Sequence, residues 1–360
     1  MTPVRIDVAS AQGTYPVFVG AGLLRESPDY LRGANLASPV VVTVPPVWRH
    51  HGAGLADLAG QAGPVMMPDG ERAKTLRTVT RLYEAFLVRR AERTTPIVAL
   101  GGGVAGDTAG FAAATFLRGL PLVHVPTTLL AQVDSAIGGK VGVNLAQGKN
   151  LAGAFYPPRL VLCDPEVLRT LPRREFRAGL YEVIKYGVIA SPMLFDLVSA
   201  NLKRVLARDA DLLTQIVVSC CRVKADVVGR DEYERGSRRV LNFGHTIGHA
   251  LETVTGYRRF RHGEAVACGM LAAAHVSASR GLMPREQAEA LADLVRRLGA
   301  LPSVDGLRSA DVLEAMARDK KARDGRLAFV LSAGLGTTRI ESDVTAGELT
   351  AALAAIGLRG

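Results

Sequence analysis

Four side chains suited to binding a divalent metal lie in two segments of the chain. Glu182 occurs in the string GLYEVIKYG, and His245, His249 and His262 occur in NFGHTIGH and RHGEA. Neutral imidazole nitrogens and carboxylate oxygens are ligands of zinc-like ions. His245 and His249 are four residues apart, so on a helix they share one face. The pattern predicts a divalent metal site, and the alternative is a pair of histidines that cap or fill a helix.

The spacing of these histidines differs from that of a zinc protease. In His245-x-x-x-His249 no glutamate follows the first histidine, so no catalytic base would sit beside the metal. We therefore expect a metal whose surrounding chemistry is carried by other residues.

Lysine is rare in this chain and is concentrated in motif-like strings. Only eight of the 44 basic residues are lysines. A lysine ammonium suits a single anionic or hydroxyl oxygen, and an arginine fork does not replace it there. Seven of the eight lie in compact strings, which predicts a pocket for a small polyanion: Lys74, Lys140, Lys149, Lys185, Lys224, Lys320 and Lys321. The Lys320-Lys321 pair alone is also typical of a solvated charge run.

The length and composition of the chain favour a two-domain protein of the cytoplasm. A chain of 360 residues, 48% of them hydrophobic, exceeds what one core usually covers. The four cysteines form no CxxC pair, which favours a reducing setting and argues against cysteine-bound zinc. The N-terminus lacks the pattern of a signal peptide, and no apolar run has the length of a membrane-spanning helix.

The net charge of +10 raises the question of a nucleic-acid partner. The arginines are spread through the chain, however, and aromatic residues make up only 5% of it. An arginine-rich solvated surface is the favoured interpretation, with steering of an anionic ligand as a secondary benefit. We expect neither a nucleic-acid nor a membrane partner.

The order of apolar patterns predicts an α/β domain followed by a helical domain. The first 20 residues alternate as a pair of strands, and five apolar runs typical of parallel strands follow: PVVVTV, GPVMMP, TPIVALGGG, LPLVHVPTT and RLVLCD. Helical patterns separate several of them, which predicts a mostly parallel, Rossmann-like sheet with helices on both faces. After Leu171 long amphipathic segments take over. We predict domains at residues 1–171 and 172–360, the second all-α.

A glycine string after one of these strands predicts a dinucleotide site. Gly101, Gly103 and Gly106 match G-x-G-x-x-G between a predicted strand and a predicted helix. The glycines would let the backbone approach a pyrophosphate, and the helix N-terminus would favour its charge. The acidic residue expected about 20 positions later is missing, so a structural turn is the alternative. Thr127 and Thr128 end the next strand, where further phosphate or ribose contacts are expected.

Together these strings resemble the 3-dehydroquinate synthase family of sugar-phosphate cyclases. The resemblance covers nearly the whole chain and includes PDGERAKT, GGGVAGDTAGFAAATFLRG, VPTTLLAQVDSAIGGKVGVN, EFRAGLYEVIKYG and RRVLNFGHTIGHALE. It implies a lyase that converts 3-deoxy-D-arabino-heptulosonate 7-phosphate to 3-dehydroquinate and phosphate, the second step of the shikimate pathway. The implied reaction comprises transient oxidation by NAD, phosphate elimination, re-reduction and an intramolecular aldol closure.

The resemblance also implies roles for the matching residues. Zinc or cobalt would be held by Glu182, His245 and His262. The NAD-binding positions implied by the resemblance and the glycine motif are Glu71, Lys74, Gly101, Gly102, Gly103, Val104, Gly106, Asp107, Thr127, Thr128, Asp134, Lys140, Lys149, Thr170 and Glu175. The implied substrate and catalytic positions are Asp134, Lys140, Asn150, Lys185, Lys224, Arg238, Asn242, His249, Lys320 and Lys321. Arg118 matches an arginine that family members lend across a dimer interface to the substrate phosphate, so a homodimer is implied.

The chain departs from the family pattern at one place. The resemblance also leaves two alternative activities open. Where relatives carry Asp or Asn for the adenosine end of NAD, this chain has Val44-Pro45-Pro46. The alternatives are another sugar-phosphate cyclase, whose sugar phosphate lacks a carboxylate, and a metal-dependent polyol dehydrogenase, which releases NADH. A doubly anionic substrate, and so the synthase, is favoured by Lys140, Asn150, Lys224, Arg238 and Asn242.

Overall fold

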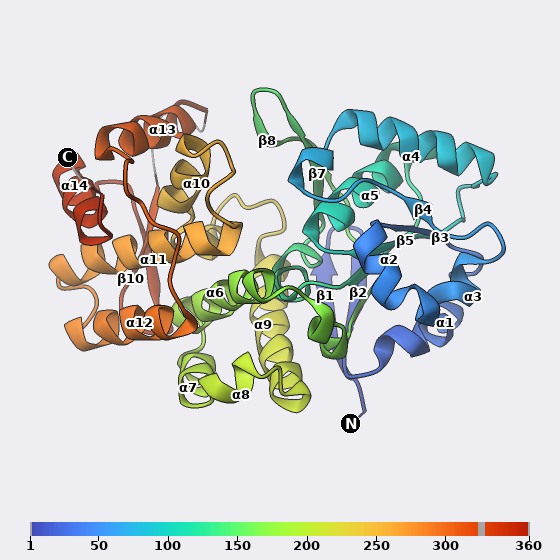
Figure 1. Ribbon diagram of the computed structural model, residues 1–360, viewed down its shortest axis with the longest axis horizontal. Coiled ribbons are helices and arrows are strands. Elements are labelled where there is room, and N and C mark those ends of the chain that lie inside the picture. Colours follow the sequence, from blue (N-terminus) through green and yellow to red (C-terminus); the bar gives the residue numbers. More distant parts are fainter. Residues whose placement is uncertain (1, 323–327, 359–360) are drawn as a thin grey trace. The chain divides into compact units, whose positions relative to one another are not determined.

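The fold is described from a computed structural model, shown as a ribbon in Figure 1. It describes residues 2–322 and 328–358, and for residues 319–322 it describes the backbone alone. The predicted site residues Lys320 and Lys321 therefore have no described side chains.

The chain folds into two compact units. Unit 1 is formed by Met1–Phe176 together with Leu206–Tyr233, and unit 2 by Arg177–Val205 together with Glu234–Gly360. The domain boundary at residue 171 stays a prediction. In the packing, the chain leaves unit 1 shortly after this residue, returns to it for one long helix, and then completes unit 2.

Unit 1 contains a seven-stranded sheet with strand order β1-β2-β9-β6-β5-β3-β4. The strands are β1 (Val4–Ser10), β2 (Gly13–Val19), β3 (Val40–Thr43), β4 (Val65–Met66), β5 (Ile97–Gly101), β6 (Leu122–Pro126) and β9 (Leu160–Cys163). β1 and β2 pair antiparallel, and all other neighbours in the sheet pair parallel. The predicted N-terminal strand pair and the predicted mostly parallel sheet are both confirmed.

Successive residues of the central strands enter two cores, one on each face of the sheet. Residues 40, 42 and 97 enter one core with helices α4 (Leu76–Val88) and α5 (Gly103–Thr115). Residues 41, 98 and 100 enter the other, with α1 (Leu23–Gly33) and α2 (Pro45–His51). Figure 1 shows α4 and α5 on one side of the strands and α1 on the other. Burial on both faces explains why these strands are continuous apolar runs.

The remaining elements of unit 1 are short helices and one hairpin that connect these strands and helices. They are η1 (Gly52–Leu55), α3 (Ala56–Ala59), η2 (Glu71–Ala73), η3 (Phe116–Arg118), η4 (Ala131–Ser135), η5 (Pro165–Thr170) and the hairpin of β7 (Lys140–Leu145) and β8 (Gly148–Phe155). The hairpin is not predicted, because its second strand, GKNLAGAF, is poor in β-branched residues and lacks alternation. α9 (Ala210–Arg230) packs against β1 and η4, which places residues 206–233 in unit 1.

Unit 2 is mostly helical, as predicted. Its elements are α6 (Arg173–Ile189), which begins in unit 1, α7 (Pro192–Ala200), α8 (Leu202–Leu206), η6 (Ser237–Asn242), α10 (His245–Val254), α11 (His262–Ser279), α12 (Arg285–Leu298), α13 (Ser309–Ala322) and α14 (Ala346–Ala355). It also contains an antiparallel hairpin, β10 (Phe329–Ser332) with β11 (Thr338–Glu341), so the prediction of an all-α half needs this correction. β10 is a buried apolar run of four residues, too short to give a periodic signal.

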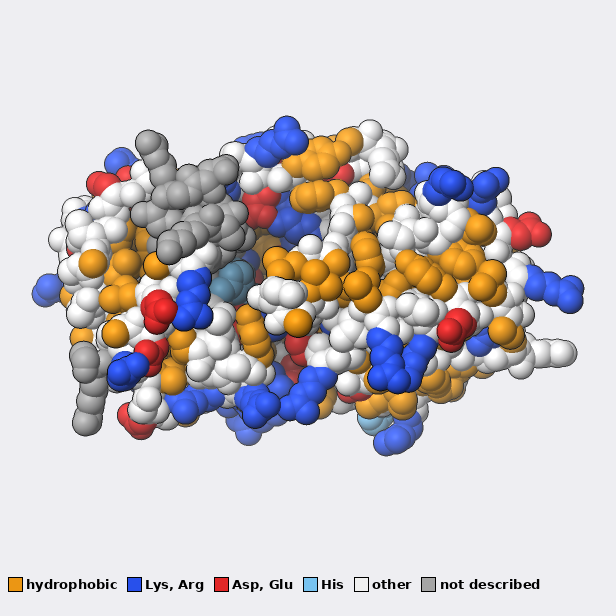
Figure 2. All heavy atoms as spheres, turned by 90° about the horizontal axis from the view of Figure 1, so that it is seen from above, with side chains coloured by type: hydrophobic (Ala, Val, Ile, Leu, Met, Phe, Trp, Pro, Cys, Tyr) orange, Lys and Arg blue, Asp and Glu red, His pale blue; other side chains and the backbone are white. Residues whose placement is uncertain are grey.

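The face of the molecule seen in Figure 2 carries its basic residues in a scattered pattern. Figure 2 shows Lys and Arg side chains interspersed with apolar and uncharged ones over the visible face. This distribution is typical of an arginine-rich solvated surface and lacks the continuous basic stripe of a nucleic-acid interface. Among the described residues, no helix is both long enough and apolar enough to cross a membrane.

Candidate active site

The glycine turn between β5 and α5 has the geometry of an anion-binding site. A Cβ atom at Gly101 would lie 2.6 Å from the Cβ of Ala105, and one at Gly102 would lie 2.8 Å from Cγ2 of Thr128. Both positions therefore need glycine. α5 begins at Gly103 without a side-chain cap, so its first N–H groups and its positive dipole end face the turn. The first turns of this helix also carry the predicted NAD contacts Val104 and Asp107.

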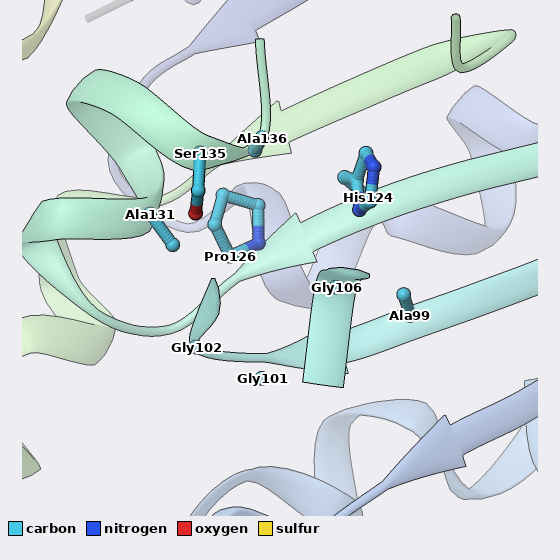
Figure 3. A pocket seen from close by; sticks show the side chains of 9 residues that line it. All are labelled: Ala99, Gly101, Gly102, Gly106, His124, Pro126, Ala131, Ser135 and Ala136. Carbon is cyan, nitrogen blue, oxygen red and sulfur yellow. The ribbon is translucent and has the colours of Figure 1, made fainter. Parts of the chain in front are cut away.

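A small cavity lies beside this turn, and Gly106 and His124 are among the residues that line it (Figure 3). In Figure 3 the His124 side chain projects from β6 on the side of Gly106. A Cβ at Gly106 would lie 3.4 Å from Nδ1 of His124, which is an ordinary van der Waals contact. The imidazole is 5% exposed, and burial lowers the pKa of His124 to about 4. It is therefore neutral at neutral pH.

The two threonines that follow β6, Thr127 and Thr128, lie close to the glycine turn. The backbone N–H of Thr127 donates to the carbonyl of Gly101 over 2.9 Å. The hydroxyl of Thr128 accepts from the N–H of Ala131 over 3.1 Å and so begins the segment that continues into η4. This places both residues at the carboxyl ends of the strands, where doubly wound sheets bind ligands.

Four predicted site residues from distant parts of unit 1 meet in one polar cluster. The ammonium of Lys74 contacts the carboxylate of Asp107 and donates to Oδ1 of Asn150 over 2.5 Å. Burial raises the pKa of the Asp107 carboxyl, although the Lys74 ammonium opposes that rise. Glu71 joins the cluster through Asn144, whose amide donates to Oε1 of Glu71 over 2.7 Å. Asn144 is a polar residue of this cluster that the sequence analysis does not single out.

A second charged pair in unit 1 joins Lys224 of α9 to Asp134 of η4. The Lys224 ammonium is 5% exposed, donates to the backbone carbonyl of Asp134 over 2.5 Å and forms an ion pair with its carboxylate. The structure thus brings together two predicted site residues that are 90 positions apart.

The other predicted residues of unit 1 are exposed or half-buried. Lys140 begins β7, and Lys149 lies in β8. Glu175 lies in the first turn of α6. Arg118 ends η3 with a left-handed φ of 67° and is exposed.

At Val44-Pro45-Pro46, where the chain departs from the family pattern, the expected adenosine end of the cofactor site has apolar residues. Val44 is buried and offers no side-chain cap to α2, which begins at Pro45. At the other end of α2, Nε2 of His51 lies 2.8 Å from Oγ1 of Thr170, a predicted NAD contact. The Thr170 hydroxyl donates to the Val167 carbonyl, so it accepts from His51. His51 is a second polar residue that the sequence analysis does not single out.

In unit 2, three side chains converge with the spacing of metal ligands. Oε1 of Glu182 lies 3.6 Å from Nε2 of His245 and 3.7 Å from Nε2 of His262. Ligand atoms of a tetrahedral zinc site lie about 3.4 Å apart. Glu182 is fully buried, its Oε2 pairs with the Lys185 ammonium, and its Oε1 has no hydrogen-bond donor among the described residues. A buried acceptor without a donor is what a metal ligand leaves when no ion is present.

Hydrogen bonds fix both histidines in the tautomer that a metal needs. Nδ1 of His245 lies 3.2 Å from the carbonyl of Phe243, and Nδ1 of His262 lies 3.1 Å from Oε2 of Glu252. Both acceptors require a proton on Nδ1. The lone pair of each Nε2, the nitrogen near Glu182, is then available to a metal. Burial, followed by the charge of Lys185, holds the pKa of His245 well below its ordinary value, so this imidazole stays neutral.

Close helix packing brings these ligands together. A Cβ at Gly269 of α11 would lie 1.8 Å from the carbonyl oxygen of Gly244, which precedes α10. A Cβ at Gly263 would lie 1.9 Å from the carbonyl oxygen of Ala178 in α6. Only glycine permits these approaches, and they set the spacing of the three helices that carry Glu182, His245 and His262.

His249 lies one turn after His245 and is exposed. The ligand atoms of His245, His249 and His262 all lie within 4.8 Å of one another, so the three histidines form a second possible ligand set. The set with Glu182 is favoured by its shorter separations and by the lack of a hydrogen-bond donor for Oε1 of this carboxylate.

The remaining predicted residues of unit 2 lie in α6 and η6. Lys185 is 1% exposed and lies one turn from Glu182. Arg238 is 3% exposed, and the amide of Asn242 donates to Oε1 of Glu234 over 2.5 Å.

Two family models match successive parts of the chain. Residues 64–178 match the family described as 3-dehydroquinate synthase N-terminal, and residues 179–322 match 3-dehydroquinate synthase C-terminal. The 3-dehydroquinate synthase of a Synechococcus strain is 46% identical over 98% of this chain and 99% of its own.

Two solved structures of sugar-phosphate cyclases share the fold. The 2-epi-5-epi-valiolone synthase of Streptomyces hygroscopicus, solved with NAD⁺ and Zn²⁺, is 29% identical, with a TM-score of 0.87 over 97% of this chain and 98% of its own. A 2-deoxy-scyllo-inosose synthase complexed with carbaglucose-6-phosphate, NAD⁺ and Co²⁺ is 30% identical, with a TM-score of 0.85 over 97% and 99%. The matched profiles and the full-length relative show that the chain belongs to the 3-dehydroquinate synthase family.

Proposed function

We propose that the chain converts 3-deoxy-D-arabino-heptulosonate 7-phosphate to 3-dehydroquinate and inorganic phosphate. The observation that carries this proposal is the full-length similarity to a 3-dehydroquinate synthase at 46% identity. Each unit adds a matching site: an anion-binding glycine turn in unit 1 and a cluster of metal ligands in unit 2.

Glu182, His245 and His262 fit a zinc or cobalt ion. Their donor atoms are one carboxylate oxygen without a hydrogen-bond donor and two imidazole nitrogens whose Nδ1 protons are already engaged. When bound, the ion would polarise the substrate hydroxyl that is oxidised. The contact of Lys185 with the second oxygen of Glu182 would hold the carboxylate in place for this role.

The glycine turn, together with Glu71, Lys74, Asp107 and the threonines of β6, fits NAD. Side chains are excluded where a pyrophosphate would lie, and the uncapped N-terminus of α5 favours its charge. When bound, NAD would supply the transient oxidation of the substrate and its reversal. The cyclases named above, which have NAD⁺ bound in their structures, support this assignment.

The basic and amide side chains would bind the two anionic groups of the substrate and hold it through the reaction. They are Lys140, Asn150, Lys224, Arg238 and Asn242. Arg238 is suited to a bidentate contact with carboxylate or phosphate. His249, exposed beside the metal ligands, would transfer a proton near neutral pH. Binding energy from the two anionic ends can favour retention of the oxidised intermediate.

The proposal includes a homodimer in the cytoplasm. Arg118 is exposed on a left-handed backbone, and within the described parts of the chain its side chain has no hydrogen-bond or ion-pair partner. Such a side chain is suited to reach the phosphate site of a second subunit. All four cysteines are free and buried, which supports a reducing compartment.

Phosphate release tests the substrate assignment. The heptulosonate phosphate is compared with glucose 6-phosphate and sedoheptulose 7-phosphate, each with and without NAD⁺ and a chelator. We expect release only from the carboxylate-bearing substrate, and only with both NAD⁺ and the metal. Faster release from either sugar phosphate that lacks the carboxylate would instead assign the chain to another cyclase activity.

A further inference from the structure

The side-chain amide of Asn144 connects a predicted cofactor contact with a predicted substrate contact. Its Nδ2 donates to Oε1 of Glu71 over 2.7 Å, and its Oδ1 accepts from the backbone N–H of Asn150 over 2.9 Å. A carboxylate oxygen only accepts and a backbone N–H only donates, so the chemistry fixes the orientation of this amide. Asn144 is half-buried, so its bond to Glu71 is partly shielded from water, whereas its bond to Asn150 is exposed.

A local irregularity of β7 directs Asn144 towards this position. The pairing of β7 with β8 shifts register between Val143 and Leu145, so Asn144 lies outside the regular ladder. Its backbone N–H instead donates to the carbonyl of Lys74 over 2.9 Å, and it forms a parallel bridge with Thr75. Bulges of this kind redirect side chains next to active sites.

These bonds close a ring around the polar cluster of unit 1. Asn150 has a left-handed φ of 55°, an uncommon conformation that asparagine tolerates better than most residues. Its side-chain oxygen accepts from the Lys74 ammonium over 2.5 Å, and the Lys74 backbone N–H donates to the Glu71 carbonyl over 3.1 Å. The ring therefore passes through Glu71, Asn144, Asn150 and Lys74.

We infer that Asn144 is a positioning residue that holds Glu71 for the cofactor and Asn150 for the substrate at the same time. The inference rests on the proposed function, because it takes Glu71 as an NAD contact and Asn150 as a substrate contact. Without the amide donor the Glu71 carboxylate loses its fixed direction. Without the amide acceptor the left-handed backbone of Asn150 loses the bond to its own N–H.

Substitutions of Asn144 can test the amide donor and the amide acceptor separately. Asn144→Asp keeps an oxygen for the Asn150 N–H but places a carboxylate against Glu71. We expect the Kd for NAD⁺, measured by titration calorimetry, to rise about tenfold or more, because a charged hydrogen bond is replaced by like-charge repulsion. The KM for the heptulosonate phosphate at saturating NAD⁺ should change by less than about threefold, because the Asn150 bond is kept. Asn144→Ala should raise both constants.

A double-mutant cycle with Glu71→Gln shows whether Asn144 acts through Glu71. In the doubly substituted chain the introduced glutamine amide can donate to the introduced aspartate, which restores a hydrogen bond of reversed polarity. Asn144→Asp should therefore weaken NAD⁺ binding less in the Glu71→Gln background than in the unmodified chain. Asn201→Asp is the matched control, because it also removes an Nδ2 donor, to the carbonyl of Leu197 in unit 2. It should leave the Kd for NAD⁺ unchanged.

The outcomes separate this inference from the proposed function. Phosphate release and NAD⁺ binding by the unmodified chain test the proposed function, and their absence would overturn both. If the unmodified chain is active, an unchanged Kd for NAD⁺ in Asn144→Asp would overturn the inference alone. So would equal effects of Asn144→Asp in the two backgrounds, since they would mean that Asn144 acts independently of Glu71.

Discussion

Oε2 of Glu252 lies 3.1 Å from Nδ1 of His262, and the Glu252 side chain is almost fully buried. The two residues are ten positions apart and belong to α10 and α11. The contact fixes the tautomer and the ring orientation of His262, because a carboxylate requires a proton on Nδ1. Nε2 is then free to bind a metal together with Glu182 and His245. We therefore propose that Glu252 orients His262 as a metal ligand without itself binding the metal.

Glu252→Gln is expected to weaken metal binding. The glutamine keeps the size of the side chain but removes the charge that makes the imidazole a better donor. The affinity for Zn²⁺ or Co²⁺, measured by competition with a chromogenic chelator, should fall about 10- to 100-fold. Glu348→Gln is the control, because the Glu348 carboxylate lies in the same unit and pairs with Arg280 and Thr345 instead of a histidine. Equal metal affinities of Glu252→Gln and the unmodified chain would rule out the orienting role.

Gly269→Ala is expected to disrupt the metal cluster by separating two helices. The added Cβ would lie 1.8 Å from the carbonyl oxygen of Gly244, so α11 must move away from the start of α10. We expect a loss of about 3 kcal/mol or more in the free energy of unfolding, together with weaker metal binding. Gly347→Ala in α14 is the control, because a Cβ there meets nothing within 4 Å. It should be neutral or stabilising by up to about 1 kcal/mol. A Gly269→Ala protein with unchanged stability would contradict the close helix contact.

The buried His124 is expected to make the fold sensitive to acid. Burial lowers its pKa from 6.5 to about 4, so between these values the unfolded chain binds a proton that the folded chain excludes. The free energy of unfolding therefore falls as the pH falls through this window, by about 3 kcal/mol in total. His124→Gln should lose this component, which urea unfolding at pH 7 and pH 4 would measure. The exposed His275→Asn gives the control, and a pH dependence that stays unchanged in His124→Gln would contradict the assignment.

Arg118 is expected to act on the site of a second subunit. Arg118→Ala and Lys140→Ala should each be nearly inactive. In a hybrid dimer one of the two sites would have both residues intact, so mixing the variants should restore about a quarter of the unmodified activity. Mass spectrometry under native conditions would confirm that hybrids form. Hybrids without activity would show that Arg118 serves its own subunit.

The strands and long helices were predictable because their patterns are local. The parallel strands are buried on both faces, so each appears as an apolar run, and Gly101 to Gly106 mark the turn at the end of β5. The β7–β8 hairpin and β10 were not predictable, because their pairing depends on contacts between residues rather than on a periodic pattern.

The types of the candidate metal ligands were predictable from the residues, but their grouping was implied only by the family resemblance and not by their spacing. Spacing alone pairs His245 with His249 on one helix face. The structure instead places Glu182 of α6 nearest to His245 and His262, through helix contacts that require glycine. Asn144 and Glu252 stand inside recognisable strings, GGKVGVN and HTIGHALE, yet only a strand irregularity and a helix pairing reveal what they contact.

The fate of the hydride shows whether the chain acts as the synthase or as a dehydrogenase of the same fold. Phosphate release from the heptulosonate phosphate is followed with NAD⁺ at a small fraction of the substrate concentration, while absorbance at the NADH band is recorded. We expect many phosphates released for each NAD⁺ and no accumulation of NADH, since the hydride returns to the same substrate. NADH formed in proportion to the substrate consumed, or equal turnover of an uncharged polyol, would contradict it.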